Sequence, residues 1–452
     1  MRDLAYIYAS QRKYALAEPL YARCLQIQEK NLKPQDIEIV RTVSMQAYTY
    51  HALKKYRQEE QNYIRNLAAM EQIQGMPPVE FVIVMANLGN VQRSLDQYQK
   101  AQESYQRSVS MGEKSLDKDH PDLINSIHGL ATLYVDSNQY AKAEPLFVHV
   151  LATREKNLGP DHGQVAEAME SLALLYKLES KLTESETLWK RALAINEKLY
   201  GPDHLKIAKT IHGLSQVYME QAKYTETESI LQRALAIREK NLEPDHPDID
   251  QILNSFSVLY STQKRYAEAL PYATRTLHIW EKTADSSPLL VANALNNLSA
   301  IYISQGKLNE AEDALKRSLV IREKIYGANG SEVAQSLNNL SAFYIQQKRY
   351  KEAGINSRRA LQLWEKTLGP DHPSVAVVLG NLATCYTEQN MFLEAEPLYK
   401  RALSIREKAL GPNHPEVAVN LNSMAELYKK MGRLQESAML ADRAASIAAI
   451  QR

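Results

Sequence analysis

A fixed period of 42 residues constrains this chain more than any other feature of its sequence. The period is clearest from Phe392 to Val417, FLEAEPLYKRALSIREKALGPNHPEV, and earlier copies begin at residues such as Tyr14 and Tyr140. A period of 20 to 50 residues indicates stacked supersecondary units rather than a closed globule. We therefore expect one continuous solenoid domain over residues 1–452. One slot recurs eleven times without insertion or deletion, at Tyr14, Tyr56, Tyr98, Tyr140, Leu182, Tyr224, Tyr266, Leu308, Tyr350, Phe392 and Leu434.

Each repeat is predicted to form two helices. In residues 374–389 apolar side chains recur at spacings of three and four, which is the period of a helix with one buried face. A second amphipathic helix is predicted over residues 393–410, and the GPDHP loop at Gly369 suits a helix end followed by a helix start. Such a hairpin cannot bury its own apolar stripe, so neighbours must stack. The expected fold is all-α: a right-handed superhelical solenoid of about 11 antiparallel helix pairs, with the first helix truncated.

The repeat resembles the tetratricopeptide repeat, whose pattern of leucine, small and aromatic residues maps onto Leu382, Ala383, Tyr386, Ala395, Tyr399 and Ala402. The usual repeat has 34 residues; here the second helix is longer by eight. A 42-residue repeat with LNNL in its first helix and RALxIREKxLGPDHP in its second is similar to the kinesin light chain class. The resemblance covers the whole chain and implies protein binding. The heptad segment that joins a light chain to its motor is absent, so the chain resembles a relative and not a kinesin light chain itself.

The second and third repeats, at about residues 42–118, depart from the pattern. Gln46 replaces a leucine of the first helix, Asn66 replaces a buried alanine, and Gln92 replaces a tyrosine that the other ten repeats share. We expect residues 42–95 to be the least stable part of the array. The loops at 285–288 and 328–331 are also degenerate.

Composition narrows the classes of partner. The chain has 54 basic and 53 acidic residues, so its net charge of +1 gives no reason to expect nucleic acid or an anionic membrane. No apolar run approaches a membrane span, and the N-terminus has no signal-peptide pattern. Cys24 and Cys385 are expected to be free, buried thiols, which favours the cytoplasm. The sequence begins partway through a first helix, which suggests a fragment.

Catalytic chemistry finds no support in the sequence. No GxxxxGK, HExxH, CxxC or GxSxG motif occurs. Six of the eleven histidines recur in one loop slot, one repeat or more apart, which is too far to share a metal ion. We therefore predict a structural loop role for them and no enzyme, cofactor or metal. Of the 26 tyrosines, 21 occupy three periodic slots, so we expect those to be core. The histidines of the loop slot are His120, His162, His204, His246, His372 and His414.

A polar signal lies on the first helices. In arrays of this family the first helices line the concave surface, and kinesin light chains and the transferase that adds N-acetylglucosamine to Ser and Thr hold extended peptides with an asparagine ladder there. Asparagine is a middling helix former, so its recurrence is not explained by propensity. An amide can both donate and accept a hydrogen bond, and so can satisfy a peptide backbone. The alternative is that these amides cap or bridge neighbouring helices. The candidates are Asn254, Asn293, Asn296, Asn297, Gln335, Asn338, Asn339, Asn381 and Asn422.

We predict a protein-interaction scaffold that binds an extended or short helical segment in its concave groove, mainly over residues 250–430. Because no repeat stacks several lysines or arginines, the ligand should be neutral to mixed in charge. One alternative is the sensor or regulatory array of a larger protein with an NTPase or protease domain. Another is a self-assembling rod, because no polar capping helix follows the final ADRAASIAAI; we expect a monomer and leave end-to-end association open. Earlier first helices are mixed in charge, at His128, Glu167, Glu170, Lys177, Lys209, His212 and Glu220.

Overall fold

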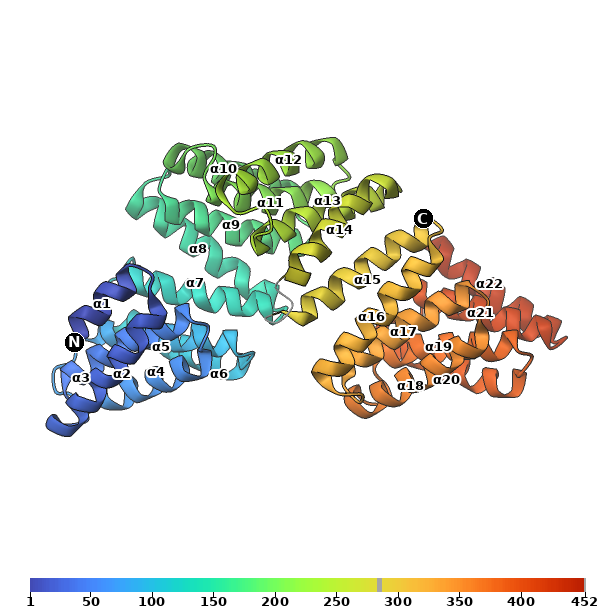
Figure 1. Cartoon of the computed structure of the whole chain (residues 1–452), viewed down its shortest axis with the longest axis horizontal. Coiled ribbons are helices and arrows are strands. Elements are labelled where there is room, and N and C mark those ends of the chain that lie inside the picture. The colour runs from blue at the N-terminus through green and yellow to red at the C-terminus, as the bar shows by residue number, and fades with distance from the viewer. Residues whose placement is uncertain (283–286, 451–452) are drawn as a thin grey trace. The chain divides into compact units, whose positions relative to one another are not determined.

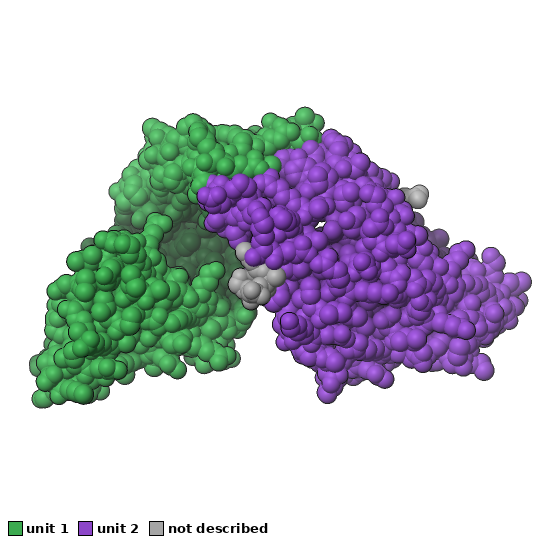
Figure 2. Space-filling model, in the orientation of Figure 1, with its two compact units in different colours: residues 1–241 green, residues 242–452 purple. Residues whose placement is uncertain are grey.

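The computed structural model describes residues 1–282 and 287–450, and every element within them is helical. Apart from one short 3-10 turn at Pro247–Ile249, the elements are 22 α-helices that pair in chain order into hairpins (Figure 1). This confirms the predicted all-α fold of stacked helix pairs. The chain divides into two compact units, residues 1–241 and 242–452, here called unit 1 and unit 2 (Figure 2). A single domain over the whole chain stays a prediction.

The first helix of each hairpin has 13 to 17 residues, except for the nine-residue α1. In unit 1 these are α1 (Arg2–Ser10), α3 (Ile37–Ala52), α5 (Pro78–Ser94), α7 (Pro121–Asp136), α9 (Gly163–Leu178) and α11 (Leu205–Glu220). In unit 2 they are α13 (Asp250–Thr262), α15 (Pro288–Ser304), α17 (Ser331–Gln346), α19 (Pro373–Glu388) and α21 (Pro415–Lys430).

The second helices have 15 to 19 residues, and the shortest is α4 in the degenerate second repeat. In unit 1 these are α2 (Tyr14–Asn31), α4 (Tyr56–Met70), α6 (Tyr98–Ser115), α8 (Tyr140–Leu158), α10 (Leu182–Tyr200) and α12 (Tyr224–Asn241). In unit 2 they are α14 (Tyr266–Lys282), α16 (Leu308–Tyr326), α18 (Tyr350–Leu368), α20 (Phe392–Leu410) and α22 (Leu434–Ile450).

The turn inside every hairpin contains one residue with a left-handed backbone. This residue is glycine only at Gly306 and Gly432, and the other nine have φ between 55° and 60° without a glycine. Asparagine fills the slot at Asn138 and Asn390, as expected for a left-handed helix end. The recurrence at one slot shows that the hairpin turn is uniform even where its sequence is not.

Small residues let the helices approach closely. Ala383, Ala395 and Ala402 are fully buried. A Cβ added at Gly213 would lie 2.3 Å from the ring of Trp189, so the ring occupies the space that any side chain there would need. Close packing of this kind leaves little tolerance for added volume.

Ion pairs 36 residues apart join the second helices of consecutive hairpins. In each, the arginine at the slot of Arg401 in the RAL motif contacts the glutamate that lies, in the preceding repeat, at the slot of Glu407 in the IREK motif. The pairs lie partly in solvent, so each contributes less than about 1 kcal/mol, but they recur along both units. Seven of them span 2.5–3.0 Å: Arg65–Glu29, Arg191–Glu155, Arg233–Glu197, Arg317–Glu281, Arg359–Glu323, Arg401–Glu365 and Arg443–Glu407.

The six loop histidines are helix caps, which confirms their predicted structural role. In each, the ring Nδ1 accepts a hydrogen bond of 3.1–3.3 Å from the backbone N–H two residues later. The imidazole thus satisfies one of the four amide groups that a helix start leaves without a partner. These caps explain why the GPDHP loop repeats.

The second repeat folds with a polar interior. Glu59 is 2% exposed, although the other ten repeats have Ala, Ser or Thr in its slot, and both of its carboxylate oxygens lie 3.2 Å from Nδ1 of His51. Asn66 is 1% exposed and donates to Ser44 Oγ at 2.8 Å. The polar groups are therefore tolerated because they bond to one another. The lower stability expected for residues 42–95 stays a prediction.

Both cysteines are free, as predicted. Cys385 is fully buried, and burial raises the pKa of its thiol to about 12. Cys24 is only half-buried, so the prediction of two buried thiols was wrong for this residue. Cys24 lies in the first hairpin, where no earlier hairpin covers α2 among the described residues. The degenerate loop at 285–288 lies largely outside those residues, because 283–286 are not described.

Candidate peptide-binding surface

Four of the five first helices of unit 2 are almost free of charge, whereas α21 has Glu416, Glu426, Lys429 and Lys430. Helix α15 contains no Asp, Glu, Lys or Arg, and α13, α17 and α19 contain one each. Those three, Asp250, Glu332 and Glu388, lie in the first or last turn of their helices. Successive first helices also touch, as α17 does α19 and α19 does α21. Together α13, α15, α17 and α19 form a neutral strip, here called the amide surface.

The predicted site residues lie outside the core, eight of them on this surface and Asn422 on α21. Asn293, Asn297, Gln335 and Asn422 are exposed. The other five, Asn254, Asn296, Asn338, Asn339 and Asn381, are half-buried. All nine side chains therefore lie where a ligand on the first helices could meet them, which burial in the core would have prevented.

Two pairs of these amides bond across consecutive hairpins. Asn381 Nδ2 donates to Asn338 Oδ1 at 2.9 Å, and Asn297 Nδ2 donates to Asn254 Oδ1 at 3.3 Å. The partners are 43 residues apart in both cases, so each bond joins neighbouring first helices. Bridging, the alternative role considered for these amides, thus applies to these four residues. A primary amide has two N–H groups and two lone pairs, so one bond leaves capacity for a ligand.

Asn293 forms a hydrogen bond with a buried arginine that was not predicted from the sequence. Its Oδ1 accepts from Nη2 of Arg322 at 2.8 Å, and Nη1 of Arg322 donates to Ser336 Oγ at 3.0 Å. Arg322 is 7% exposed, and burial lowers the pKa of its guanidinium. In unit 1, Arg154 bonds Asn125 in the same way at 2.9 Å. The signal was in the sequence, because from the fourth repeat to the tenth arginine fills this slot in every second repeat, at Arg154, Arg238, Arg322 and Arg406.

The remaining candidates are placed differently. Gln335 Nε2 donates to Asn339 Oδ1 at 3.0 Å within α17. The Oδ1 atom of Asn296 is buried without a hydrogen-bond partner among the described residues. Asn422 is exposed on α21, beyond the last bonded pair. The structure therefore joins the candidates into pairs and not into one continuous ladder.

A groove of about 290 Å³ lies between α13 and α15 at the first amide pair. None of the side chains that line it carries a charge. Val258, 48% exposed, supplies an apolar surface beside the amides. A neutral groove with a few polar groups suits an uncharged peptide segment. Its lining is Asn254, Ser257, Val258, Ser261, Thr262, Tyr266, Asn297, Ala300, Ile301 and Ser304.

The first helices of unit 1 present a different chemistry. Lys206 pairs with Glu167 at 2.7 Å, and Lys177 with Glu220 at 3.8 Å. His128 bonds Ser171 Oγ at 3.0 Å, and burial and the charge of a neighbouring arginine lower its pKa to about 4. Its imidazole is therefore neutral at neutral pH. The mixed character predicted for this stretch follows from these pairs.

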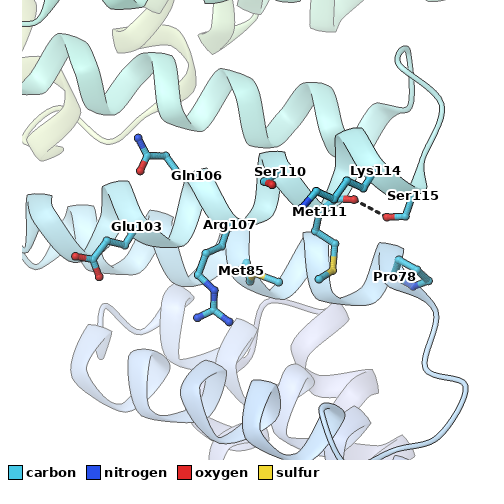
Figure 3. A pocket seen from close by; sticks show the side chains of 9 residues that line it. All are labelled: Pro78, Met85, Glu103, Gln106, Arg107, Ser110, Met111, Lys114 and Ser115. Atoms are coloured by element: carbon cyan, nitrogen blue, oxygen red, sulfur yellow. Dashed lines mark hydrogen bonds between the residues drawn. The ribbon is translucent and has the colours of Figure 1, made fainter.

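A groove of about 580 Å³ lies on α5 and α6 in unit 1 and was not predicted (Figure 3). Met85 and Met111 give it an apolar floor, and Arg107 and Lys114 are among the charged residues that line it. The ion pair between Arg107 and Glu71 is longer here, at 3.9 Å, than at the seven regular junctions. The groove thus lies in the repeat that follows α4, the short second helix of the degenerate second repeat.

Neither a metal centre nor a membrane span emerges from the described part of the chain. No group of three or more His, Cys, Asp or Glu side chains within residues 1–282 and 287–450 could hold a metal ion. Over the same residues, no helix has the length and apolar character needed to cross a bilayer.

Comparison with known proteins identifies the family. Models described as tetratricopeptide repeat match residues 1–38, 81–156, 164–224, 207–282, 290–353, 332–408 and 391–449. The chain therefore belongs to the tetratricopeptide repeat family, in which the repeat is typically a non-catalytic, protein-binding scaffold. No curated protein matches the chain.

Solved structures agree on the fold. A signal-transduction ATPase with a tetratricopeptide repeat sensor from Pyrococcus horikoshii is 13% identical, with a TM-score of 0.54 over 90% of this chain and 72% of its own. BtubC (BKLC) from P. vanneervenii is 19% identical, with a TM-score of 0.35 over 60% of this chain and 92% of its own. A putative kinesin light chain from Podosopora anserina is 20% identical, with a TM-score of 0.32 over 55% of this chain and 98% of its own. Of these three, the Pyrococcus structure, with its TM-score above 0.5, supports the fold of stacked tetratricopeptide repeats.

Proposed function

We propose that the amide surface of unit 2 binds an extended or short helical segment of a partner protein, without catalysis. The observation that supports this most is the row of exposed and half-buried amides on α13, α15, α17 and α19, with charges confined to the helix ends. A core does not need amides there, and hydrogen bonds between neighbouring helices use only part of their capacity. Free thiols suit the cytoplasm as the place of this function.

The chemistry of the surface selects the ligand. Amides can donate to carbonyl groups and accept from N–H groups, which every peptide offers regardless of sequence. Side-chain selection would come from grooves such as that at Val258. Because burying an unpaired charge costs several kcal/mol, a neutral to mixed segment fits this surface better than a strongly charged one.

The double variant Asn338→Ala with Asn381→Ala tests the proposal. It removes one bonded amide pair, and we expect the affinity for captured partners to fall about tenfold or more, since a lost hydrogen bond costs roughly 1 kcal/mol and two amides are lost. Quantitative pull-down with mass spectrometry, followed by titration of the captured partner, measures the change. Circular dichroism should show unchanged helix content.

A matched control removes two amides from the second helices. Asn309→Ala with Gln362→Ala changes exposed residues of α16 and α18 and should leave binding unaltered. If the first-helix variant captures the same partners as the wild type with equal affinity, the amide surface is not the binding site.

A second candidate function is a sensor array within a larger protein. The similar Pyrococcus structure has a tetratricopeptide repeat sensor beside its ATPase, which favours this candidate. An in-frame NTPase or protease motif upstream of Met1 in the gene would support it, and an upstream stop codon would contradict it.

End-to-end self-association is a separate proposal, which sedimentation across a concentration range tests.

A further inference from the structure

Five tyrosines fall outside the three periodic slots, and two of these occupy one slot in consecutive repeats. Tyr6 and Tyr48 are 42 residues apart, on the first helices α1 and α3. They are 57% and 59% exposed, so neither serves the core. The other nine repeats have no aromatic residue there, but Asn90, Thr132, Leu174, Gln216, Val258, Ala300, Ala342, Thr384 and Glu426.

These two tyrosines line a groove of about 480 Å³ between α1 and α3 in unit 1. Tyr14 and Tyr21 of α2 and Met45 of α3 also line it. The rings of Tyr14 and Tyr48 meet edge to face, with centroids 6.3 Å apart and planes at 66°. Arg12 is the one charged residue in the lining. The result is a tyrosine-walled groove on the first helices, in a different unit from the amide surface.

We propose that this tyrosine groove binds a proline-rich segment of a partner in the polyproline II conformation. Aromatic-lined grooves recognise such segments because flat rings pack against proline rings, and because the segment is already extended and loses little entropy. The backbone carbonyls of polyproline II have no internal hydrogen bonds, so exposed tyrosine hydroxyls can donate to them.

The spacing of the two exposed tyrosines fits this ligand. They repeat at the same slot of neighbouring first helices, and packed helices lie about 8–10 Å apart. Three residues of polyproline II advance about 9 Å, so prolines at positions i and i+3 can meet the two rings. An amphipathic helix would instead need a continuous apolar trough, whereas this groove has hydroxyl groups along its walls.

A fluorescent decaproline peptide is the probe. Fluorescence anisotropy should show that the full chain binds it at least tenfold more tightly than a Gly-Ser peptide of equal length. In the double variant Tyr6→Ala with Tyr48→Ala we expect affinity to fall about tenfold or more, as for truncation of aromatic anchors. Alanine occupies this slot in well-formed helices at Ala300 and Ala342, so the variant should keep its helix content.

Two further variants make the outcome decisive. Tyr6→Phe with Tyr48→Phe keeps the rings and should retain more affinity than the alanine variant. Asn309→Ala with Gln362→Ala, on the second helices of unit 2, should bind decaproline like the wild type. The proposal is overturned if decaproline does not bind, if Gly-Ser binds equally, or if the alanine variant binds as tightly as the wild type. It is also overturned if the phenylalanine variant loses as much affinity as the alanine variant, since ring packing would then not hold the ligand.

Discussion

At equivalent positions of the repeat, hairpin α3–α4 has Glu59 and Asn66 where hairpin α17–α18 has Ala353 and Ala360. All four are buried. In α3–α4 the carboxylate is bonded by His51, whereas α17–α18 has an apolar residue at the corresponding position. Both hairpins nevertheless form two helices with the same left-handed turn between them.

The difference shows which features of a hairpin the fold requires. Family models match residues 332–408 but leave 39–80 unmatched, although α3 and α4 are both formed. The turn and the stacking on neighbours are common to the two hairpins, and the apolar interior is not. An array can therefore contain a polar hairpin, provided that its buried groups bond to one another.

The largest expected effect comes from giving α17–α18 the buried acid of α3–α4. Ala353→Glu places a carboxylate where no imidazole can bond it, so we expect a loss of about 3–5 kcal/mol. Urea unfolding followed by tryptophan fluorescence measures this, because Trp364 is buried in α18. Adding Ile345→His supplies the equivalent of His51 and should restore part of the stability. An Ala353→Glu protein as stable as the wild type would show that the interior accepts an acid unaided.

The reverse change should stabilise α3–α4. Glu59→Ala restores the small residue of the other repeats, and we expect a gain of about 1–2 kcal/mol. Burial raises the pKa of Glu59, while the charge and hydrogen bonds of His51 oppose that rise. A pKa raised in the folded state means that wild-type stability is lost as pH increases through that value. The advantage of the variant should therefore grow with pH.

Hydrogen exchange of residues 37–70, followed across pH, measures that gain locally, and α19–α22 serve as an internal reference. Equal exchange in the wild type and in Glu59→Ala at every pH would show that the buried carboxylate is not a weak point.

The smallest effect concerns the helix starts. Asp36 accepts a hydrogen bond of 2.9 Å from the N–H of Glu38 and so caps α3, whereas Gly330 gives α17 no side-chain cap. Asp36→Ala should cost about 1 kcal/mol. Thermal unfolding of the variant beside Asp36→Asn, which retains a capping side chain, isolates the hydrogen bond. A loss of the same size in both variants would contradict the assignment.

Much of the fold could be predicted because its signals repeat. The slots of Leu382, Ala395 and Ala402 recur every 42 residues, so errors at one repeat are corrected by the others. The interior of the second repeat could not be predicted, because the bond between His51 and Glu59 depends on tertiary contacts. Gln46 and Asn66 signalled a departure from the pattern but not its arrangement.

The candidate site was predictable in position but not in bonding. The recurrence of asparagine near Asn296 and Asn338 placed the amides on the first helices, where the structure has them. Which amides pair with each other depends on the offset of neighbouring helices. That offset joins Asn338 to Asn381, 43 residues apart, and the repeat period alone would have suggested 42. Peptide binding at these residues stays a prediction.

The Arg–Glu pairs that join successive second helices have a consequence for how such chains change length. Each pair reaches back 36 residues, less than one period, so its two members come from adjacent copies of the same sequence. Duplicating or deleting any 42 consecutive codons within unit 2, where this slot is always arginine, would therefore create a new junction with both charges already in place. Recombination between copies could lengthen or shorten the array in one step, without waiting for compensating point mutations.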